Sequence, residues 1–357
     1  MNLSTKSVPS HQIKGHHMNN QLLIYISTIL LAILLCGSCA ISAQEDVRPR
    51  SLVGAIRWDA WHGDVDGPSS PGLAVERSLG PEHWHYRLPF FAKVVGENRV
   101  EARANTQKIM DEEITYASNA QLDYWAFLTY APKSAMSIGM QLYLSSSLKS
   151  KMKFCLICHH IRESPEEVER LVGYIKDPQH VRVLDDRPLV YVFQCKAKRA
   201  FFDALSKALG EAGIKPPFLV DMGNNQSGIT FDAVSSYLGT HKNDWDKQKK
   251  QGRLVIPSIT GEDNRDPRVE NPVPWEGGGK GKPVQVGPRK TPIEIATSIA
   301  GKVASALEWN KSNPEAGKAN AVIIYAWNEF DEGGWICPTI SEGTNRLDAI
   351  RSVLEKK

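Results

Sequence analysis

Short apolar runs alternate with helix-like segments along most of the chain, and this alternation limits its fold more than any other feature. Eight runs have the length and composition of buried strands: 52–58, 122–128, 153–158, 187–193, 218–222, 233–237, 254–259 and 321–326. Helical patterns separate most of them, such as 164–175, which opens with Ser-Pro-Glu-Glu, and 199–212, which ends before Gly213. We therefore predict one α/β domain, a (β/α)₈ TIM barrel with long loops at its C-terminal face. The sixth strand has the weakest pattern.

Polar residues cluster directly after several of these predicted strands. The clusters occupy residues 59–64, 159–160, 224–225, 262–268 and 328–332. Because the active site of such barrels lies at the C-terminal ends of the strands, these clusters are expected to share one face.

The densest cluster follows the last predicted strand. Glu329 and Glu332 lie three positions apart between two tryptophans, before a Gly-Gly pair. Two carboxyls can exchange protons with a glycosidic bond, and aromatic faces stack on sugar rings. For an average carboxylate, capping a helix or pairing with an arginine is the better explanation, so the functional interpretation depends on this context. We predict a catalytic pair, Glu329 and Glu332, with three substrate-binding neighbours: Trp327, Asn328 and Trp335.

Other candidate binding residues follow earlier strands. Asp59, Trp61 and His62 follow the first strand, although turn formation and packing explain them equally well. His159 and His160 are adjacent, so only one of them can face the ligand, and we favour His160. Asp263 can bind a sugar hydroxyl, or it can pair with Arg268 at the surface.

The first 43 residues are predicted to be a signal peptide. An apolar run at 22–36 follows basic residues and precedes small ones, and it is short for a stable membrane span. We expect an exported protein, secreted or periplasmic, with a polar lead at 44–51 and a catalytic domain at 52–357. Lipoprotein anchoring through Cys39 is the second choice. The net charge of +3 is too small to indicate nucleic acid as a partner, and we expect a monomer.

Four cysteines remain after this leader: Cys155, Cys158, Cys195 and Cys337. The first two form a C-x-x-C motif, but on a strand such a spacing directs the two sulfurs to opposite faces. Buried thiols or one disulfide are therefore expected, with no metal site and no cofactor.

Residues 327–333 resemble the N-E-W-x-E-G signature of glycoside hydrolase family 99 and its WbsX-like relatives, with Phe330 at the Trp position. Residues 257–268 are similar to the P-x-x-x-G-W-D-N-x-P-R segment of that group, with Glu262 at the Trp position and one extra residue. Residues 187–191 are similar to its G-R-P-V-V-Y strand. The resemblance covers most of residues 52–357, but only the first motif is specific.

The resemblance implies a TIM-barrel endo-mannosidase-like enzyme that retains configuration and needs no metal. The first motif carboxylate, here Glu329, would deprotonate the sugar 2-hydroxyl and give a 1,2-anhydro intermediate. The second, Glu332, would protonate the leaving oxygen and then activate water. The substrate-binding H-x-E-P segment of the family reads His-His-Ile-Arg-Glu at 159–163, without Glu-Pro, and this departs from the pattern for mannose.

Three functions follow from the sequence. The preferred one is a secreted glycoside hydrolase acting on a polysaccharide or glycan. The second is a non-catalytic glycan-binding protein on the same scaffold. The third is a metal-assisted deacetylase using His62, His159 or His160, although no H-x-x-E-H or comparable spacing supports it.

Overall fold

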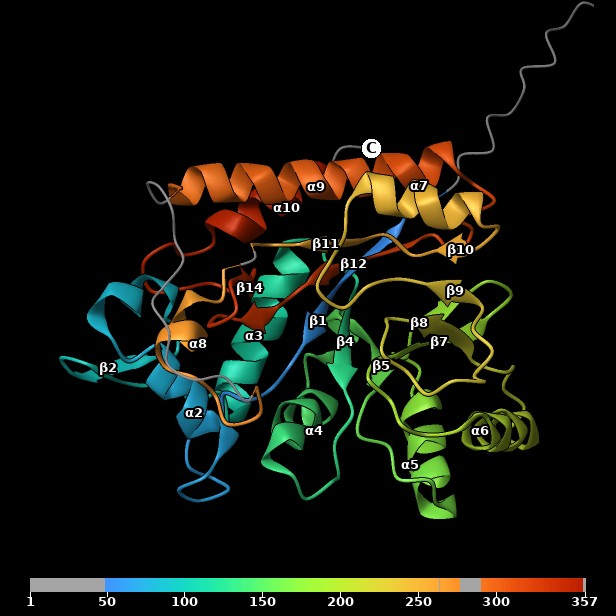
Figure 1. The fold of residues 1–357 in the computed structure, drawn as a ribbon, viewed down its shortest axis with the longest axis horizontal. Coiled ribbons are helices and arrows are strands. Elements are labelled where there is room, and N and C mark those ends of the chain that lie inside the picture. The colour runs from blue at the N-terminus through green and yellow to red at the C-terminus, as the bar shows by residue number, and fades with distance from the viewer. Residues whose placement is uncertain (1–48, 263, 277–289, 356–357) are drawn as a thin grey trace, which may run out of the picture. The chain divides into compact units, whose positions relative to one another are not determined.

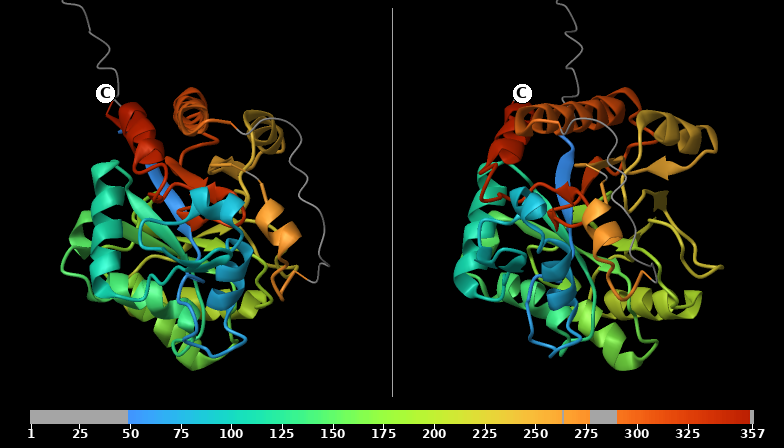
Figure 2. Two further views of the ribbon diagram at one scale, coloured as in Figure 1. Left: turned by 90° about the vertical axis from the view of Figure 1, so that its left-hand side faces the viewer. Right: turned by 60° about the vertical axis from the view of Figure 1, so that its left-hand side comes forward.

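The computed structural model describes residues 49–262, 264–276 and 290–355. A curled parallel sheet lies at the centre of the unit formed by residues 50–355 (Figures 1 and 2). Nine strands follow one path, in the order β10 (Leu254–Val255), β9 (Ala233–Val234), β8 (Phe218–Asp221), β7 (Arg187–Val192), β5 (Lys153–Cys158), β4 (Tyr124–Leu128), β1 (Leu52–Arg57), β12 (Ala321–Tyr325) and β11 (Ser258–Thr260). The neighbours on this path are parallel, and β6 (Arg182–Val183) adds to β7 in the antiparallel sense. The fold is TIM-barrel-like.

The two ends of this strand order are consecutive segments of the chain. Strands β10 and β11 are separated only by Ile256 and Pro257. The predicted strand at 254–259 is therefore divided: its first part pairs with β9 and its second part with β12. Proline lacks an N–H group for a sheet hydrogen bond, and this favours a break between the two pairings.

Two apolar clusters lie on the two faces of the sheet. In β12 every residue is buried, and successive side chains point to opposite faces. Val322 and Ile324 join a cluster that also contains helical residues such as Leu171. Ile323 and Tyr325 join a second cluster, which contains no residue from a described helix. Burial on both faces explains why the strands read as continuous apolar runs.

Helices cover the sheet on several sides. Helices α7 (Lys242–Lys250) and α9 (Pro292–Ser312) lie along the top of Figure 1, and α5 (Pro165–Ile175) and α6 (Arg199–Glu211) lie at the bottom. Helix α5 begins as predicted, because Ser164 caps it by accepting from the Glu167 backbone N–H at 3.3 Å. The other long helices are α3 (Gln107–Asn119), α4 (Ile138–Ser145) and α10 (Asn345–Leu354). No described helix has both the length and the apolar character needed to cross a membrane.

The connection after β1 carries regular structure of its own. It contains α2 (Pro71–Ser78), a 3₁₀ helix at Glu82–Arg87, and a hairpin formed by β2 (Lys93–Gly96) and β3 (Arg99–Glu101). Ser70 and Pro71 form the start of α2, where proline is favoured and Ser70 accepts from the Gly72 backbone N–H.

All four cysteines of the described chain are buried free thiols. Cys155 lies in the cluster without helical residues and Cys158 in the other, so their side chains lie on opposite faces of β5. Burial raises the pKa of both thiols, which keeps them protonated and unreactive. The predicted signal peptide, Cys39 and Asp263 all lie outside the described residues.

Candidate active site

A tight turn after β12, residues 328–335, brings the two predicted catalytic carboxyls together. We call this segment the catalytic turn after that prediction. Strands β13 (Asn328–Glu329) and β14 (Gly334–Trp335) pair in the antiparallel sense, and the Glu332 N–H donates to the Glu329 carbonyl at 3.2 Å. Both side chains line one open cavity of about 1310 Å³. They are only 2% and 7% exposed, so they lie at the bottom of this cavity.

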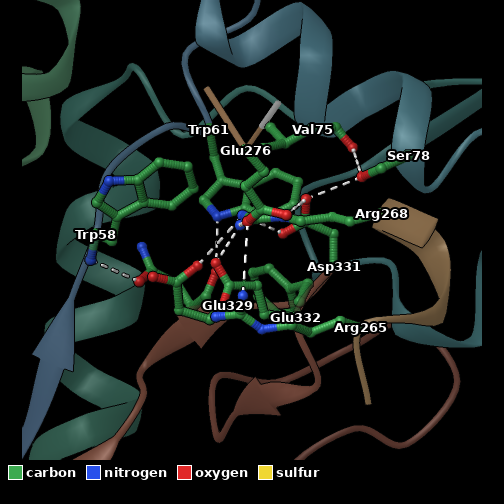
Figure 3. Close-up of polar contacts among 12 residues, drawn as sticks. Trp58, Trp61, Val75, Ser78, Arg265, Arg268, Glu276, Glu329, Asp331 and Glu332 are labelled. Atoms are coloured by element: carbon green, nitrogen blue, oxygen red, sulfur yellow. Dashed lines mark hydrogen bonds and ion pairs between the residues drawn. The ribbon is translucent and has the colours of Figure 1, made fainter. Parts of the chain in front are cut away.

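The guanidinium of Arg268, on α8 (Asp266–Glu270), lies against four carboxylates (Figure 3). Its Nε and Nη2 donate to the two oxygens of Asp331 at 2.7 and 3.1 Å. Its Nη1 donates to Glu332 and, at 2.7 Å, to Glu276, and its Nη2 lies 3.7 Å from Glu329 Oε2. Arg268 is 3% exposed, so these are buried charges that need one another. The surface pairing considered from sequence is not what the structure contains.

Separate groups hold the two catalytic candidates from their other sides. Glu332 accepts from Arg265 and from the Tyr325 hydroxyl. Glu329 Oε1 accepts from the Tyr237 hydroxyl at 3.2 Å. Its Oε2 is buried and has no hydrogen-bond partner among the described residues, although Arg268 lies nearby. Buried polar atoms rarely stay without a partner, so this oxygen is the free acceptor of the site.

Burial raises the pKa of both carboxyls, and neighbouring charges adjust the size of each rise. Burial raises the pKa of Glu329 well above its usual value, and the charge of Glu332 raises it further against the opposing effect of Arg268. Burial also raises the pKa of Glu332, but Arg268 and Arg265 oppose that effect. Two carboxyls on one guanidinium titrate as a pair. A proton that binds to the pair is therefore shared between Glu329 and Glu332.

Aromatic rings form much of the cavity wall. Trp58 follows β1 and meets Trp275 edge-on at a centroid distance of 5.6 Å. Tyr130 accepts from the Trp58 indole N–H at 2.8 Å. Phe193 stacks on Tyr237 with centroids 4.1 Å apart and planes only 7° from parallel. Flat walls of this kind are suited to the faces of sugar rings.

The tryptophans that we predicted from the sequence as binding residues lie in the apolar core, outside the cavity. Trp61, Trp327 and Trp335 are at most 2% exposed, belong to the larger apolar cluster and do not line the cavity. Trp327 donates to Glu113 at 2.8 Å, and Trp335 lies under the guanidinium of Arg346. The structure places them behind the catalytic turn as packing.

Of the polar residues predicted to bind substrate, some hold the turn in place and others line the cavity. Asn328 accepts from the Trp58 backbone N–H at 3.0 Å and donates to Asp59 at 3.3 Å, so this pair joins the end of β1 to the catalytic turn. His62 is buried beside Ser70 Oγ at 3.4 Å and does not line the cavity. His160 and His159 both line it. No group of three or more potential metal-ligating side chains was found within the described ranges.

Sequence reasoning missed several residues that the structure brings to the site. Trp58 and Tyr237 were counted as residues of the first and sixth predicted strands, and Trp275 lies outside all predicted strands. The available signal was position: Trp58 and Tyr237 are the last residues of predicted strands, where barrel ligands bind. Nothing local marked Arg268 as the partner of Asp331, because 62 residues separate them in the chain.

The catalytic turn is also clamped to the loop that carries Arg265 and Arg268. Gly333 adopts φ +89°, and a Cβ there would lie 2.6 Å from the Asn264 backbone nitrogen. The Asn264 N–H donates to the Glu332 carbonyl at 3.2 Å. Only glycine allows this approach without strain.

Solved structures with a similar fold include two of the GH99 endo-alpha-mannosidase from Bacteroides thetaiotaomicron. One, in complex with bis-tris propane, is 17% identical with a TM-score of 0.51, and the other is 16% identical with a TM-score of 0.52. Each match covers 85% of this chain and 95% of that one. The likeness is one of fold. The sequence matches no protein-family model and no curated protein.

Proposed function

We propose that this chain is a glycoside hydrolase that cleaves O-glycosidic bonds in a polysaccharide or glycan, with Glu329 and Glu332 as its catalytic carboxyls. One observation carries the proposal: two buried carboxyls with raised pKa values contact the same guanidinium at the bottom of a large, aromatic-lined cavity. Perturbed carboxyl pairs in a cleft are typical of acid–base catalysis. The GH99 fold neighbours support a glycan as the substrate.

The finer proposal is an endo-α-mannosidase-like enzyme that retains anomeric configuration. In the roles that the motif resemblance implies, Glu329 takes the proton of the sugar 2-hydroxyl as that oxygen attacks the anomeric carbon. Glu332 gives a proton to the departing glycosidic oxygen. A water, deprotonated by Glu332, later attacks the anomeric carbon and opens the three-membered ring, while Glu329 returns its proton to the 2-oxygen. We also propose that the sheet closes into a barrel through residues 254–260 and that residues 1–43 direct export.

These roles require Glu329 to be ionised and Glu332 to be protonated when the sugar reacts. Burial raises the pKa of both carboxyls, so the ionised Glu329 needs a neighbouring positive charge. The guanidinium of Arg268 contacts both carboxyls and is held in place by Asp331, so it can stabilise the charge on Glu329 without moving. We propose that a bound sugar, which fills the cavity and displaces water, leaves the proton of the pair on Glu332.

The test is a screen of the purified protein against α-mannans and other plant and algal polysaccharides, with chromatography of the products. Glu329→Gln and Glu332→Gln should each lose hydrolysis by at least about a hundredfold while keeping the wild-type circular dichroism. Lys247→Gln, on the exposed side of α7, is the matched control and should keep full activity. Normal turnover by both glutamine variants would reject the proposal.

The glycan-binding alternative predicts a different result in the same screen. Oligosaccharide would bind and stay uncleaved after long incubation, although both carboxyls are intact. A metal-assisted deacetylase would release acetate and lose activity on chelation, and its loss would not follow the glutamine variants.

A further inference from the structure

One wall of the active-site cavity carries positive charge that the catalytic cluster does not use. Arg162 and Lys196 follow β5 and β7, line the cavity and are exposed. Within the described residues neither of them forms an ion pair. The adjacent Glu163 does not line the cavity, and its carboxylate accepts from the backbone N–H of Lys198 at 3.3 Å.

The acidic lining residues all lie on the other side, with Arg265 and the buried Arg268. Glu276, Glu329 and Glu332 contact Arg268, and Glu276 and Glu332 also contact Arg265. Each of these carboxylates lies against a guanidinium, whereas Arg162 and Lys196 have no such counter-charge among the described residues. Arg162 and Lys196 are therefore the cations of this cavity that remain available to an anionic ligand.

A continuous row of rings joins the two walls. Tyr237, hydrogen-bonded to Glu329, stacks on Phe193, and Phe193 stacks on His159 with centroids 5.8 Å apart. His159 meets His160 at 4.1 Å. The histidines add no charge of their own, because burial lowers the pKa of both, and Lys196 lowers that of His160 further. A sugar chain lying along these rings with one unit at Glu329 would bring a neighbouring unit to Arg162 and Lys196.

We propose that this cavity selects a glycan that carries anionic groups, carboxylates or sulfate esters, on the sugar units held by Arg162 and Lys196. The inference rests on the proposed function, since it concerns the substrate class of the same site. Guanidinium binds such oxyanions through two parallel hydrogen bonds, and ammonium binds them as a point charge. Both cations are exposed, so each contact is modest and sensitive to salt.

The test uses three matched polymers: an α-mannan, the same mannan after chemical sulfation, and the same mannan after oxidation of its 6-hydroxyls to carboxylates. Binding is measured with the full-length Glu332→Gln variant by affinity electrophoresis, and cleavage is measured with the wild type. We expect at least one anionic form to bind roughly tenfold more tightly than the neutral form at low salt, with the preference shrinking as salt is raised. The sulfated and oxidised arms distinguish the two anions.

Charge removal shows whether the preference comes from this wall. Adding Arg162→Gln and Lys196→Gln to the binding variant should abolish the preference for the anionic form and leave binding of neutral mannan unchanged. Adding Lys247→Gln and Lys250→Gln instead removes the same charge from α7, whose residues do not line the cavity, and should leave the preference intact.

Equal or tighter binding of neutral mannan, no binding of either anionic form, or an equal loss in both double-charge variants would overturn the inference. If the wild type cleaves the polymers without any anionic preference, the proposed function stands and this inference fails. If anionic forms bind through Arg162 and Lys196 but the wild type cleaves neither these polymers nor any polysaccharide of the wider screen, the inference stands and the hydrolase proposal fails.

Discussion

Arg268 and Asp331 form a bidentate, fully buried ion pair, with Nε and Nη2 of the arginine 2.7 and 3.1 Å from the two carboxylate oxygens. Asp331 lies between the two catalytic candidates in sequence but does not line the cavity. Its second partner is the Ser78 hydroxyl at 2.9 Å. The pair fixes the guanidinium from behind, so that its remaining nitrogen faces Glu332 and Glu276. Catalysis and stability are therefore expected to depend on it together.

Replacing Arg268 by Met should lower both stability and turnover. The variant leaves Asp331 buried without its cation, and breaking a buried pair in this way costs roughly 3–5 kcal/mol of unfolding free energy. Chemical denaturation measures this loss. Arg268→Met with Asp331→Asn should recover part of the stability and none of the activity, because the guanidinium near Glu329 and Glu332 is still missing. Recovery of activity in the double variant would contradict a role for Arg268 at the carboxyls.

The roles of the two carboxyls can be separated by leaving-group dependence. If Glu332 is the acid, Glu332→Gln should retain far more activity on a glycoside of an acidic phenol than on a polysaccharide, since such a group leaves without protonation. Glu329→Gln should lose both activities by a similar factor. Steady-state rates on the two substrates decide the matter. The opposite pattern would assign the acid role to Glu329.

Removing the Tyr237 hydroxyl should move the pH profile. The hydroxyl donates to Glu329 and so opposes the rise in its pKa. In Tyr237→Phe the pKa of Glu329 should rise further, so the acidic limb of the kcat/KM profile should shift to higher pH by up to about one unit. The packing on Phe193 stays the same. An unchanged profile with a lower rate at every pH would mean that the hydroxyl contacts substrate and does not tune Glu329.

Glu329 should also make stability depend on pH. Its pKa is higher in the folded state than in the unfolded state, so the folded protein binds more protons between those two values. Its contribution is most favourable below the unfolded pKa and is lost as pH rises through the folded one. Glu329→Gln imitates the neutral form and should therefore be more stable than wild type at pH 8, by about 0.5–2 kcal/mol. The difference should shrink toward pH 4 in thermal melts. A variant that is less stable at pH 8 would contradict this reading of the site.

Local sequence patterns could predict the strands and most long helices. The apolar run at 321–326 and the Ser-Pro-Glu-Glu start of α5 carry their own signals, in β-branched composition and in capping chemistry. The position of Glu329 and Glu332 beside the cavity followed from the strand before them. In contrast, aromatic type alone could not show which tryptophans face the cavity. Trp327 faces inward because Glu113, more than two hundred positions earlier, accepts from its indole. The contacts of Arg268 are equally non-local.

The close approach of Gly333 to Asn264 means that the two loops can change only together. The loop after β11 and the turn after β12 meet backbone to backbone, so neither can be lengthened or exchanged without the other. Chimeras that swap only one of them should be inactive even when each parent is active. The connections after β5 and β7, which carry Arg162 and Lys196, have no such backbone tether to this turn within the described chain. We therefore expect that sequence changes in those connections can alter what the cavity binds without displacing Glu329 and Glu332.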